Sequence, residues 1–407
     1  MKKPHYGWAV CIACLFLFLC NMGLCSNILT IYLPFIEDRG IPDSMGSAIL
    51  SVRCAFSFLT TFFVGIYYQK FSLRRGILLC STVGVLFPLV FCAAVNAPAL
   101  YYLGAALAGI AYGAGCIYPV SLLLNNWFHA RRGLAIGISA AGSGIATMLF
   151  SPLLSSVAER HSLSAAFLLH ASFMAVAAVA VYLVVRDTPE EMGLHPYGET
   201  AQQAEEEKVQ PAFAPPHHML WMLALMMLLT GGAGLAFSGH LAVLMRTEGY
   251  APAFAASMVS LFGMVLVVSK LFTGAIADRI GPKRCSILLF SVFILGCFFV
   301  LGMDGSETVW CIALAAALGI GSPIFNVGPP LWAGDLSSRE HYAKTLKWMQ
   351  IFYNLGGIVF TVVPGIIADH THEYKSAFLL FAAMMAAALT ILLWAYRRRL
   401  TLSKTNL

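Results

Sequence analysis

The sequence predicts an all-α membrane protein that crosses the bilayer twelve times, in two halves of six helices each. Hydrophobic residues make up 59% of the 407 positions and charged residues only 11%, whereas soluble proteins carry about 25% charged residues. Apolar stretches of roughly 20 residues, long enough to cross a hydrocarbon core about 30 Å thick, recur along the whole chain. One soluble core could not bury that much apolar surface.

Apolar runs between polar interruptions define the twelve predicted helices. The first run follows Lys2 and Lys3 and continues to about residue 34. It is therefore predicted as an uncleaved first helix rather than a signal peptide. The approximate ranges are 7–34, 45–68, 77–96, 99–124, 133–157, 164–185, 219–245, 253–277, 285–303, 308–333, 346–368 and 376–396.

One long polar connection separates the first six helices from the last six. It contains Glu205, Glu206 and Glu207 and five prolines between positions 189 and 216, so it is too polar to cross a membrane and too rich in proline for one long helix. The predicted organisation is an N-terminal six-helix bundle at 1–186, a cytoplasmic linker at 187–218, a C-terminal six-helix bundle at 219–396 and a cytoplasmic tail at 397–407.

The distribution of Lys and Arg predicts the orientation. Of the 25 such residues, nineteen fall on one side of the predicted helices and four, Arg39, Arg160, Arg246 and Lys375, fall on the other. Because translocated loops carry fewer basic residues, both termini and the linker are expected in the cytoplasm, with the chain in the inner or plasma membrane. The net charge of +6 is thus explained by topology, and no nucleic-acid partner is expected.

The two halves resemble one another. The second helix of each half ends in a similar basic segment, residues 65–75 and 274–284, at an offset of 209. Parallel six-helix repeats joined by a cytoplasmic linker, with a substrate site near the midplane, are an architecture of secondary transporters.

Three segments resemble a known family. Gly274, Asp278, Gly281 and Lys283 resemble the loop signature of the major facilitator superfamily, whose first-half counterpart at Gly65 is degraded. The segments 126–144 and 191–198 are similar to those of its monocarboxylate and oxalate/formate transporters. The resemblance covers essentially the whole chain and implies the major facilitator fold, a monomer that suffices for function, and transport without a cofactor or metal.

The glycines and the charged residues of these segments can also be interpreted without the family resemblance. Small residues let helix backbones approach closely in a bilayer, so packing is the favoured role for the glycines and lining of a ligand site is the alternative. The charged loop is expected to latch one conformation as a gating loop, with a solvated loop as the alternative. The glycines are Gly133, Gly137, Gly142 and Gly144, and the gating loop comprises Asp278, Arg279, Lys283 and Arg284.

Two cations, Arg53 and Lys270, fall inside predicted helices, whereas none of the 19 acidic residues lies in the middle of one. A charge inside the bilayer is costly and usually faces a cavity on a substrate or ion path. With no carboxylate to pair with, the expected counter-ion is an anionic substrate. Counting back from Gly65 and Gly274 places the two cations roughly 12 Å apart in depth, so one small monocarboxylate could not touch both. Snorkelling to an interface is the alternative for each.

The resemblance sharpens the expectation for Lys270. Monocarboxylate and oxalate transporters carry a substrate-binding arginine one turn before the glycine that corresponds to Gly274, and Lys270 falls on the position of that arginine. Three positions depart from the family. Asn27 stands where animal monocarboxylate carriers have a first-helix lysine, Leu266 stands where they have an aspartate, and Tyr353 stands near the eleventh-helix lysine of oxalate carriers.

Further polar residues occur in apolar helix stretches. Their donors suit a carboxylate, although each is also suited to an interhelical hydrogen bond. The predicted substrate-lining residues besides Lys270 and Arg53 are Asn27, Tyr118, Asn326, Tyr353 and Asn354.

Proton symport would need a group that titrates as substrate binds. His240, His170 and Lys270 itself are the candidates, with a hydrogen-bonded or interfacial role as the alternative for each histidine. Exchange of one anion for another would need no titrating group.

The favoured function is secondary active transport of a small organic anion, a mono- or dicarboxylate, by alternating access. Its partners are that anion, membrane lipid and, for symport, protons. The first alternative is export of a larger amphipathic compound past aromatic and Met side chains. The second is a membrane sensor or intramembrane enzyme, for which the sequence offers no HExxH pair, intramembrane acid dyad or Walker loop. The eleven cysteines lack metal-ligand spacing and are predicted as small apolar residues.

Overall fold

The structure, a computed structural model, describes residues 5–37, 43–94, 97–198, 213–371 and 373–405. Arg39 and the acidic middle of the predicted linker, residues 199–212, lie outside these ranges. Within them twelve helices are long and apolar enough to cross a membrane, which confirms the twelve predicted helices. They are Gly7–Asn27, Ala48–Lys70, Leu73–Ala94, Leu100–Trp127, Arg132–Arg160, Leu163–Val184, His217–Thr247, Ser257–Ile280, Pro282–Gly302, Thr308–Phe325, Arg339–Ala368 and Lys375–Arg399.

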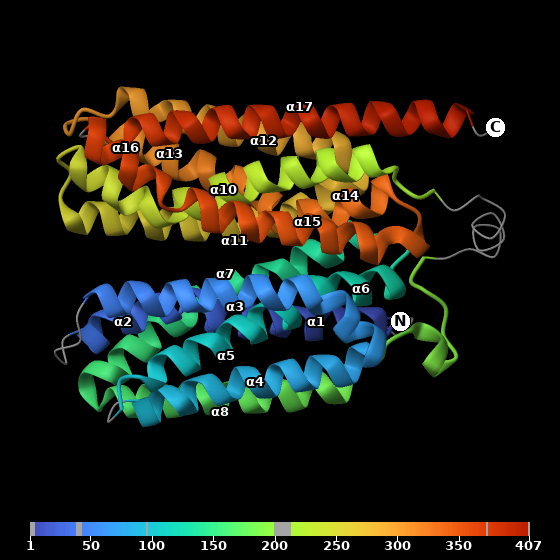
Figure 1. The fold of residues 1–407 in the computed structure, drawn as a ribbon, viewed down its shortest axis with the longest axis horizontal. Coiled ribbons are helices and arrows are strands. Elements are labelled where there is room, and N and C mark those ends of the chain that lie inside the picture. The colour runs from blue at the N-terminus through green and yellow to red at the C-terminus, as the bar shows by residue number, and fades with distance from the viewer. Residues whose placement is uncertain (1–4, 38–42, 95–96, 199–212, 372, 406–407) are drawn as a thin grey trace. The chain divides into compact units, whose positions relative to one another are not determined.

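The chain forms two compact units, Met1–Gln210 and Pro211–Leu407, and six of the described spans belong to each (Figure 1). Unit 1 contains α1 (Gly7–Leu17), η1 (Phe18–Asn27), α2 (Leu29–Glu37), α3 (Asp43–Lys70), α4 (Leu73–Ala94), α5 (Leu100–Gly115), α6 (Ile117–Trp127), α7 (Arg132–Arg160), α8 (Leu163–Val184) and η2 (Pro189–Met192). Unit 2 contains α10 (His217–Thr247), α11 (Pro252–Ile280), α12 (Pro282–Phe298), η3 (Phe299–Gly302), α13 (Thr308–Gly321), η4 (Ser322–Phe325), α14 (Gly328–Leu336), α15 (Arg339–Phe360), α16 (Val363–Thr371) and α17 (Lys375–Thr405).

Large apolar side chains cover the outward faces of several spans. Phe62, Phe63, Val176 and Phe272 are each more than half exposed. Exposing apolar area to water costs roughly 25 cal/mol for each Å², so such faces are suited to hydrocarbon. The spans therefore present large apolar side chains on faces suited to contact with lipid.

Small residues mark the closest helix crossings in both units. A Cβ at Gly142 of α7 would overlap the carbonyl oxygen of Leu15 in α1, which fits the packing role predicted for this glycine. In unit 2, a Cβ at Gly231 of α10 would overlap the backbone of Tyr353 in α15. Close backbone approach of this kind takes the place of a hydrophobic drive between helices in lipid.

Several spans are not regular α-helices throughout. The first changes to π-helix over η1, the fourth breaks at Cys116 (φ −109°, ψ −105°), the tenth breaks between η4 and α14, and the eleventh breaks between α15 and α16. At the fourth, Asn21 Nδ2 donates a 2.7 Å hydrogen bond to the carbonyl of Gly115. At the tenth, Pro323 begins the irregular stretch and Pro329 and Pro330 follow it. Proline lacks the N–H that would continue the helical ladder.

The segment after the sixth span packs on unit 1 up to Gly198. Tyr197 donates its backbone N–H to the carbonyl of Trp127 (2.8 Å), and its own carbonyl accepts from His129 and Ala130. Trp127 Nε1 in turn donates to the carbonyl of Arg186 (2.9 Å). Two of the segments that carry the family resemblance, 126–144 and 191–198, thus contact each other directly.

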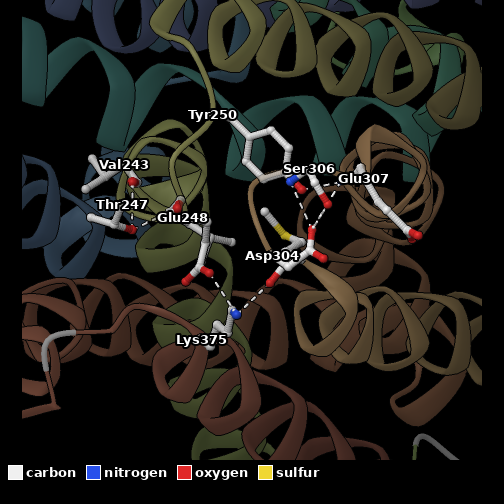
Figure 2. Close-up of polar contacts among 10 residues, drawn as sticks. Val243, Thr247, Glu248, Tyr250, Asp304, Ser306, Glu307 and Lys375 are labelled. Atoms are coloured by element: carbon white, nitrogen blue, oxygen red, sulfur yellow. Dashed lines mark hydrogen bonds and ion pairs between the residues drawn. The ribbon is translucent and has the colours of Figure 1, made fainter.

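In unit 2, a polar cluster joins three connections near the start of α17 (Figure 2). Lys375 Nζ lies 2.7 Å from Glu248 Oε2 and donates to the carbonyl of Met303 at 2.6 Å. This set, the Lys375 cluster, holds the α10–α11 connection against the η3–α13 connection and the N-terminus of α17.

Four further residues, Asp304, Ser306, Glu307 and Tyr250, complete the Lys375 cluster. Asp304 Oδ1 accepts hydrogen bonds from the backbone N–H and hydroxyl of Ser306 and from the N–H of Glu307, and these donors lower the pKa of Asp304. Tyr250 donates its hydroxyl to the carbonyl of Glu307 (2.8 Å), and burial raises the pKa of Tyr250 to about 12. Each of the four contacts joins residues in connections or at helix ends.

The last helix, α17, continues through the basic run at 397–399 as far as Thr405. The region expected as a tail at 397–407 is thus helical over most of its length. Arg397 and Arg398 are exposed there.

Candidate functional site

Lys270 lies on the buried face of α11. Its side chain is 1% exposed, and Thr273 and Ala277, three and seven residues on, are also buried. Residues at this spacing share one side of a helix. The neighbouring Phe272 is 63% exposed, so the helix presents Lys270 to the protein interior and Phe272 to the outside.

Asn326 lies at about the depth of Lys270 on the neighbouring chain segment. Helices α11 and α13 start at the same end, because Tyr250, just before α11, bonds Glu307, just before α13. A Cβ at Gly319 of α13 would come within 2.9 Å of Val265 of α11, which fixes the register. Asn326 follows Gly319 by seven residues and Lys270 follows Val265 by five, roughly 10 Å and 8 Å at 1.5 Å per residue.

Asn326 carries an orphaned polar atom. It caps η4 at the break in the tenth span and is 7% exposed, and η4 packs against α11. Its Oδ1 is buried without a hydrogen-bond partner among the described residues. Leaving a buried acceptor without a hydrogen bond costs roughly 1–3 kcal/mol. A ligand or water that donates a hydrogen bond to Oδ1 would remove this cost.

Tyr353 of α15 lies at a similar depth. The rings of Phe237 (α10) and Phe262 (α11) are 5.6 Å apart, and Gly231, which packs on the backbone of Tyr353, precedes Phe237 by six residues. Lys270 follows Phe262 by eight, so the two positions differ by only about 3 Å along the unit. Tyr353 is 4% exposed and Asn354 is half-buried.

In unit 1, Arg53 is held by neutral groups. Its Nη1 donates to the Ser26 hydroxyl at 2.7 Å and its Nη2 to Cys54 Sγ at 3.0 Å, and the guanidinium carbon lies 5.8 Å from the centre of the Tyr112 ring. The Nε of Arg53 is buried without a hydrogen-bond partner among the described residues. The sequence places no Asp or Glu between Ser44 and Ala158.

Two other predicted lining residues of unit 1 make contacts within it. Asn27, the last residue of η1, donates from Nδ2 to Thr147 Oγ1 of α7 at 3.1 Å. Tyr118 is 6% exposed, and its ring lies 5.9 Å from that of Tyr68 just after the Cys116 break. Asn27 therefore makes an interhelical hydrogen bond of the kind given as the alternative to ligand contact.

The two candidate proton carriers lie in different units and different surroundings. His170 is fully buried, with Nδ1 3.0 Å from the Tyr32 hydroxyl and the Phe87 ring 5.1 Å away. Its Nε2 has no hydrogen-bond partner among the described residues. His240 is half-buried, with Nδ1 2.8 Å from the Ala236 carbonyl and its ring stacked on Tyr374.

The residues predicted as a gating loop lie in the last turn of α11 and the first turn of α12. Asp278, Arg279 and Arg284 are exposed, and Gly281 takes a left-handed conformation (φ +86°) that favours glycine. Lys283 lies 6.0 Å from the centre of the Tyr396 ring. The Tyr396 hydroxyl donates to Asp335 at 3.0 Å, so a chain of contacts joins this loop, α17 and α14 within unit 2.

Sequence reasoning missed the neighbours of Arg53 and of Lys283. Ser26, Tyr112 and Tyr396 were not predicted, because a hydroxyl or an aromatic ring in a span carries no strong penalty that would single it out. Tyr112 interrupts an otherwise small and apolar stretch of the fourth span, and this is the one signal the sequence offered.

Two cations, Lys270 in unit 2 and Arg53 in unit 1, thus lie inside the described spans. Acidic residues within the described spans lie only within three positions of an end, at Glu159, Asp278 and Glu340. No group of three or more His, Cys, Asp or Glu side chains that could hold a metal occurs among the residues the structure describes. Such an arrangement can bind and release an anion, with amide and hydroxyl donors at the depth of Lys270.

Comparison with protein-family models identifies a match over most of the chain. The model of the Major Facilitator Superfamily matches residues 14–310 and again residues 223–407. Among solved structures, two of the fucose:proton symporter of E. coli match, one of them described as the outward conformation, with TM-scores of 0.70 and 0.71 and 16% and 14% identity. These cover 96% and 95% of this chain and 99% and 98% of those chains.

Curated relatives match at low identity. Monocarboxylate transporter 12 of Xenopus laevis is 22% identical over 92% of this chain and 85% of its own length. An MFS-type transporter of Gibberella moniliformis is 23% identical over 91% of this chain and 86% of its own length. The oxalate:formate antiporter of Oxalobacter formigenes is 31% identical over 36% of each chain.

Proposed function

Because the chain belongs to the Major Facilitator Superfamily, a family of multi-pass membrane transporters, we propose that it carries a small organic anion, a mono- or dicarboxylate. The transport is secondary and active, by alternating access of the two units. The family and the transporter relatives mark the protein as a transporter rather than an enzyme. The substrate and the coupling are the proposal.

Lys270 carries the proposal. An ammonium group that is 1% exposed in the middle of a span needs an anion or strong dipoles around it, since burying a charge is costly. The acidic residues of the described spans lie near span ends, so a substrate carboxylate is the counter-ion best placed to reach mid-span. Asn326, Tyr353 and Asn354 supply donors at a similar depth in the same unit.

Arg53, Asn27 and Tyr118 are proposed to complete the substrate path from unit 1. Arg53 retains an orphaned Nε–H, and its charge is matched only by neutral groups, which suits it to an anion passing along that unit. The names of the relatives agree with this chemistry, because one transports monocarboxylates and another exchanges oxalate for formate.

Coupling is proposed to be either proton symport or anion exchange. For symport, His240 is the better-placed carrier, because it is half-buried whereas His170 is enclosed by aromatic rings. For exchange, Lys270 would hold one anion until another replaced it. The gating loop at Asp278, Arg279, Lys283 and Arg284 would latch one conformation. We place the protein as a monomer in the cell membrane with both termini in the cytoplasm, on the asymmetry of its basic residues.

The test is uptake of labelled formate, lactate, pyruvate and oxalate into proteoliposomes, with and without a pH gradient and with and without internal anion. Wild type is compared with Lys270→Ala, Lys270→Arg and the exposed control Lys344→Ala. We expect Lys270→Ala to abolish uptake, Lys270→Arg to retain part of it, and the control to match wild type.

The driving condition separates the two couplings. Uptake driven by a pH gradient indicates symport, and uptake that requires internal anion indicates exchange. The proposal fails if wild type moves none of these anions, or if Lys270→Ala transports as well as Lys344→Ala. Either result would favour export of a larger amphipathic compound.

A further inference from the structure

An apolar groove lies on unit 1 between α3 and α4, floored by α5. Both helices pack on α5 and make few contacts with each other, as the arrangement of these three helices in Figure 1 illustrates. The groove has a volume of about 430 Å³. It is lined by Leu59 and Phe63 of α3, Phe71 just after α3, Leu79 and Val83 of α4, and Ala114 of α5.

The polar atoms in the groove wall already have partners. Thr60 donates its hydroxyl to the carbonyl of Phe56 (2.7 Å), Tyr67 donates to the carbonyl of Gly76 (2.8 Å), and Cys80 Sγ lies 3.6 Å from the Tyr67 hydroxyl. The groove thus offers an occupant apolar contact and few free hydrogen-bonding groups. Leu59, Phe63 and Leu79 are 49%, 54% and 45% exposed, so the occupant lies at the surface of the unit.

The length of the groove suits one hydrocarbon chain of a lipid. Its lining extends from Phe56 on α3 to Phe71 just after the helix, fifteen residues or about 22 Å. One leaflet of a hydrocarbon core is about 15 Å thick. The groove therefore extends from the end of the span through the depth of one leaflet.

Basic residues stand where a headgroup would be. Lys70 precedes Phe71 directly, Arg75 follows it by four residues, and both side chains are exposed. Asp187, the acid closest to the start of α4, is engaged by the backbone N–H groups of Leu73 and Arg74. The chain between Ser44 and Ala158 contains no Asp or Glu, so Lys70, Arg74 and Arg75 outnumber Asp187 at this end of the groove.

We propose that this groove is a binding site for an anionic phospholipid, with an acyl chain along α3 and α4 and the phosphate headgroup between Lys70 and Arg75. The inference goes beyond the proposed transport function and does not depend on it. In the orientation proposed above, the lipid belongs to the cytoplasmic leaflet.

The experiment is native mass spectrometry of protein released from nanodiscs made of equal phosphatidylglycerol and phosphatidylcholine. We expect wild type to retain phosphatidylglycerol selectively. Lys70→Gln with Arg75→Gln should lower that selectivity roughly fivefold for each cation removed. The matched control, Arg397→Gln with Arg398→Gln, removes the same charge from an exposed site on unit 2 and should behave as wild type.

A second pair of variants tests the acyl chain. Leu79→Trp and, separately, Leu59→Trp fill the groove from exposed positions and should reduce lipid retention whatever the headgroup. The proposal is overturned if phosphatidylcholine is retained as well as phosphatidylglycerol, if both charge variants lose selectivity equally, or if the filled groove keeps its lipid. The midpoint of thermal unfolding of each variant in detergent reports whether it is folded.

Discussion

The carboxylate of Asp187 accepts a 2.7 Å hydrogen bond from the backbone N–H of Arg74, and its other oxygen accepts one from Leu73 at 2.9 Å. Asp187 lies beyond the end of α8, yet it caps the first turn of α4 from 113 residues away. The first N–H groups of a helix lack partners within it, and an anion there is favoured by the helix dipole. This one side chain fastens the segment after the sixth span to the start of the third.

Replacing Asp187 should weaken unit 1. Asp187→Ala leaves two N–H groups without their acceptor and removes a favourable charge, so we expect a loss of about 1–3 kcal/mol and a lower midpoint of thermal unfolding in detergent. Glu190→Gln, an exposed acid in the same segment, is the control and should leave the midpoint unchanged. Equal midpoints for Asp187→Ala and wild type would mean that water replaces the cap without cost.

Replacing Lys375 should loosen unit 2 at the Lys375 cluster. Lys375→Met removes both the ion pair with Glu248 and the hydrogen bond to the Met303 carbonyl. Because the pair is 23% and 12% exposed, we expect about 1 kcal/mol of destabilisation, near the upper end for accessible pairs. Hydrogen exchange of the connection at 303–307 should become faster. Arg246→Met removes the same charge from an exposed site nearby and serves as control; faster exchange in both variants would rule out a specific role for Lys375.

Asp304 predicts a pH dependence. Hydrogen bonds from Ser306 and Glu307 lower its pKa in the folded protein, so the ionised form stabilises the fold above the unfolded pKa, near 4. That contribution is lost as pH falls through the lower folded pKa. We expect wild type to unfold at a higher temperature than Asp304→Ala at pH 7, and the difference to narrow as the pH falls below the unfolded pKa, near 4. If the difference in unfolding temperature did not change with pH, the effect of Asp304→Ala would come from the loss of the side chain itself rather than of its charge.

Arg53 should matter more for dicarboxylates than for monocarboxylates. If its orphaned Nε–H and guanidinium charge meet a second carboxylate on the path, Arg53→Gln should raise the KM for oxalate about tenfold or more and change that for formate less. Ser26→Ala removes only the 2.7 Å bond that positions Nη1, and a change of a few-fold is expected. Equal effects of Arg53→Gln on both anions, with a lower unfolding midpoint, would indicate a structural role instead.

The histidines should differ in their effect on the pH profile of uptake. His170→Gln is expected to leave the profile unchanged, because the ring is fully buried against Tyr32 and Phe87 and a charge there would lack solvation. His240→Gln should flatten the profile if transport is proton symport and leave it unchanged if transport is exchange. If His170→Gln alone removed the change in uptake at low pH, His170 rather than His240 would be the proton carrier.

The number and positions of the spans followed from the sequence because lipid imposes one strong rule: a segment that crosses it must be long, apolar and hydrogen-bonded within itself. The interruptions of the first and fourth spans did not follow. The break at Cys116 accompanies a hydrogen bond from Asn21 to the Gly115 carbonyl, a contact between distant parts of the chain that no local pattern encodes. The pairing of Tyr197 with Trp127 was missed for the same reason.

The cations of the candidate site could be found from sequence because a charge in an apolar run is conspicuous. The burial of Lys270 agrees with the expectation that it faces the interior. The orphaned atoms of Asn326 and Arg53 could not be predicted, since whether a polar atom has a partner depends on neighbours from other helices.

The packing of Tyr197 against Trp127 has a consequence for biogenesis. The segment that closes the end of unit 1 is complete at Gly198, whereas α10 starts only at His217. A ribosome delivers the chain from its N-terminus, and domains generally fold as units in that order. The first six spans can therefore pack together while the seventh is still being synthesised. The second half of the chain would then insert beside a unit 1 that has already folded in the bilayer.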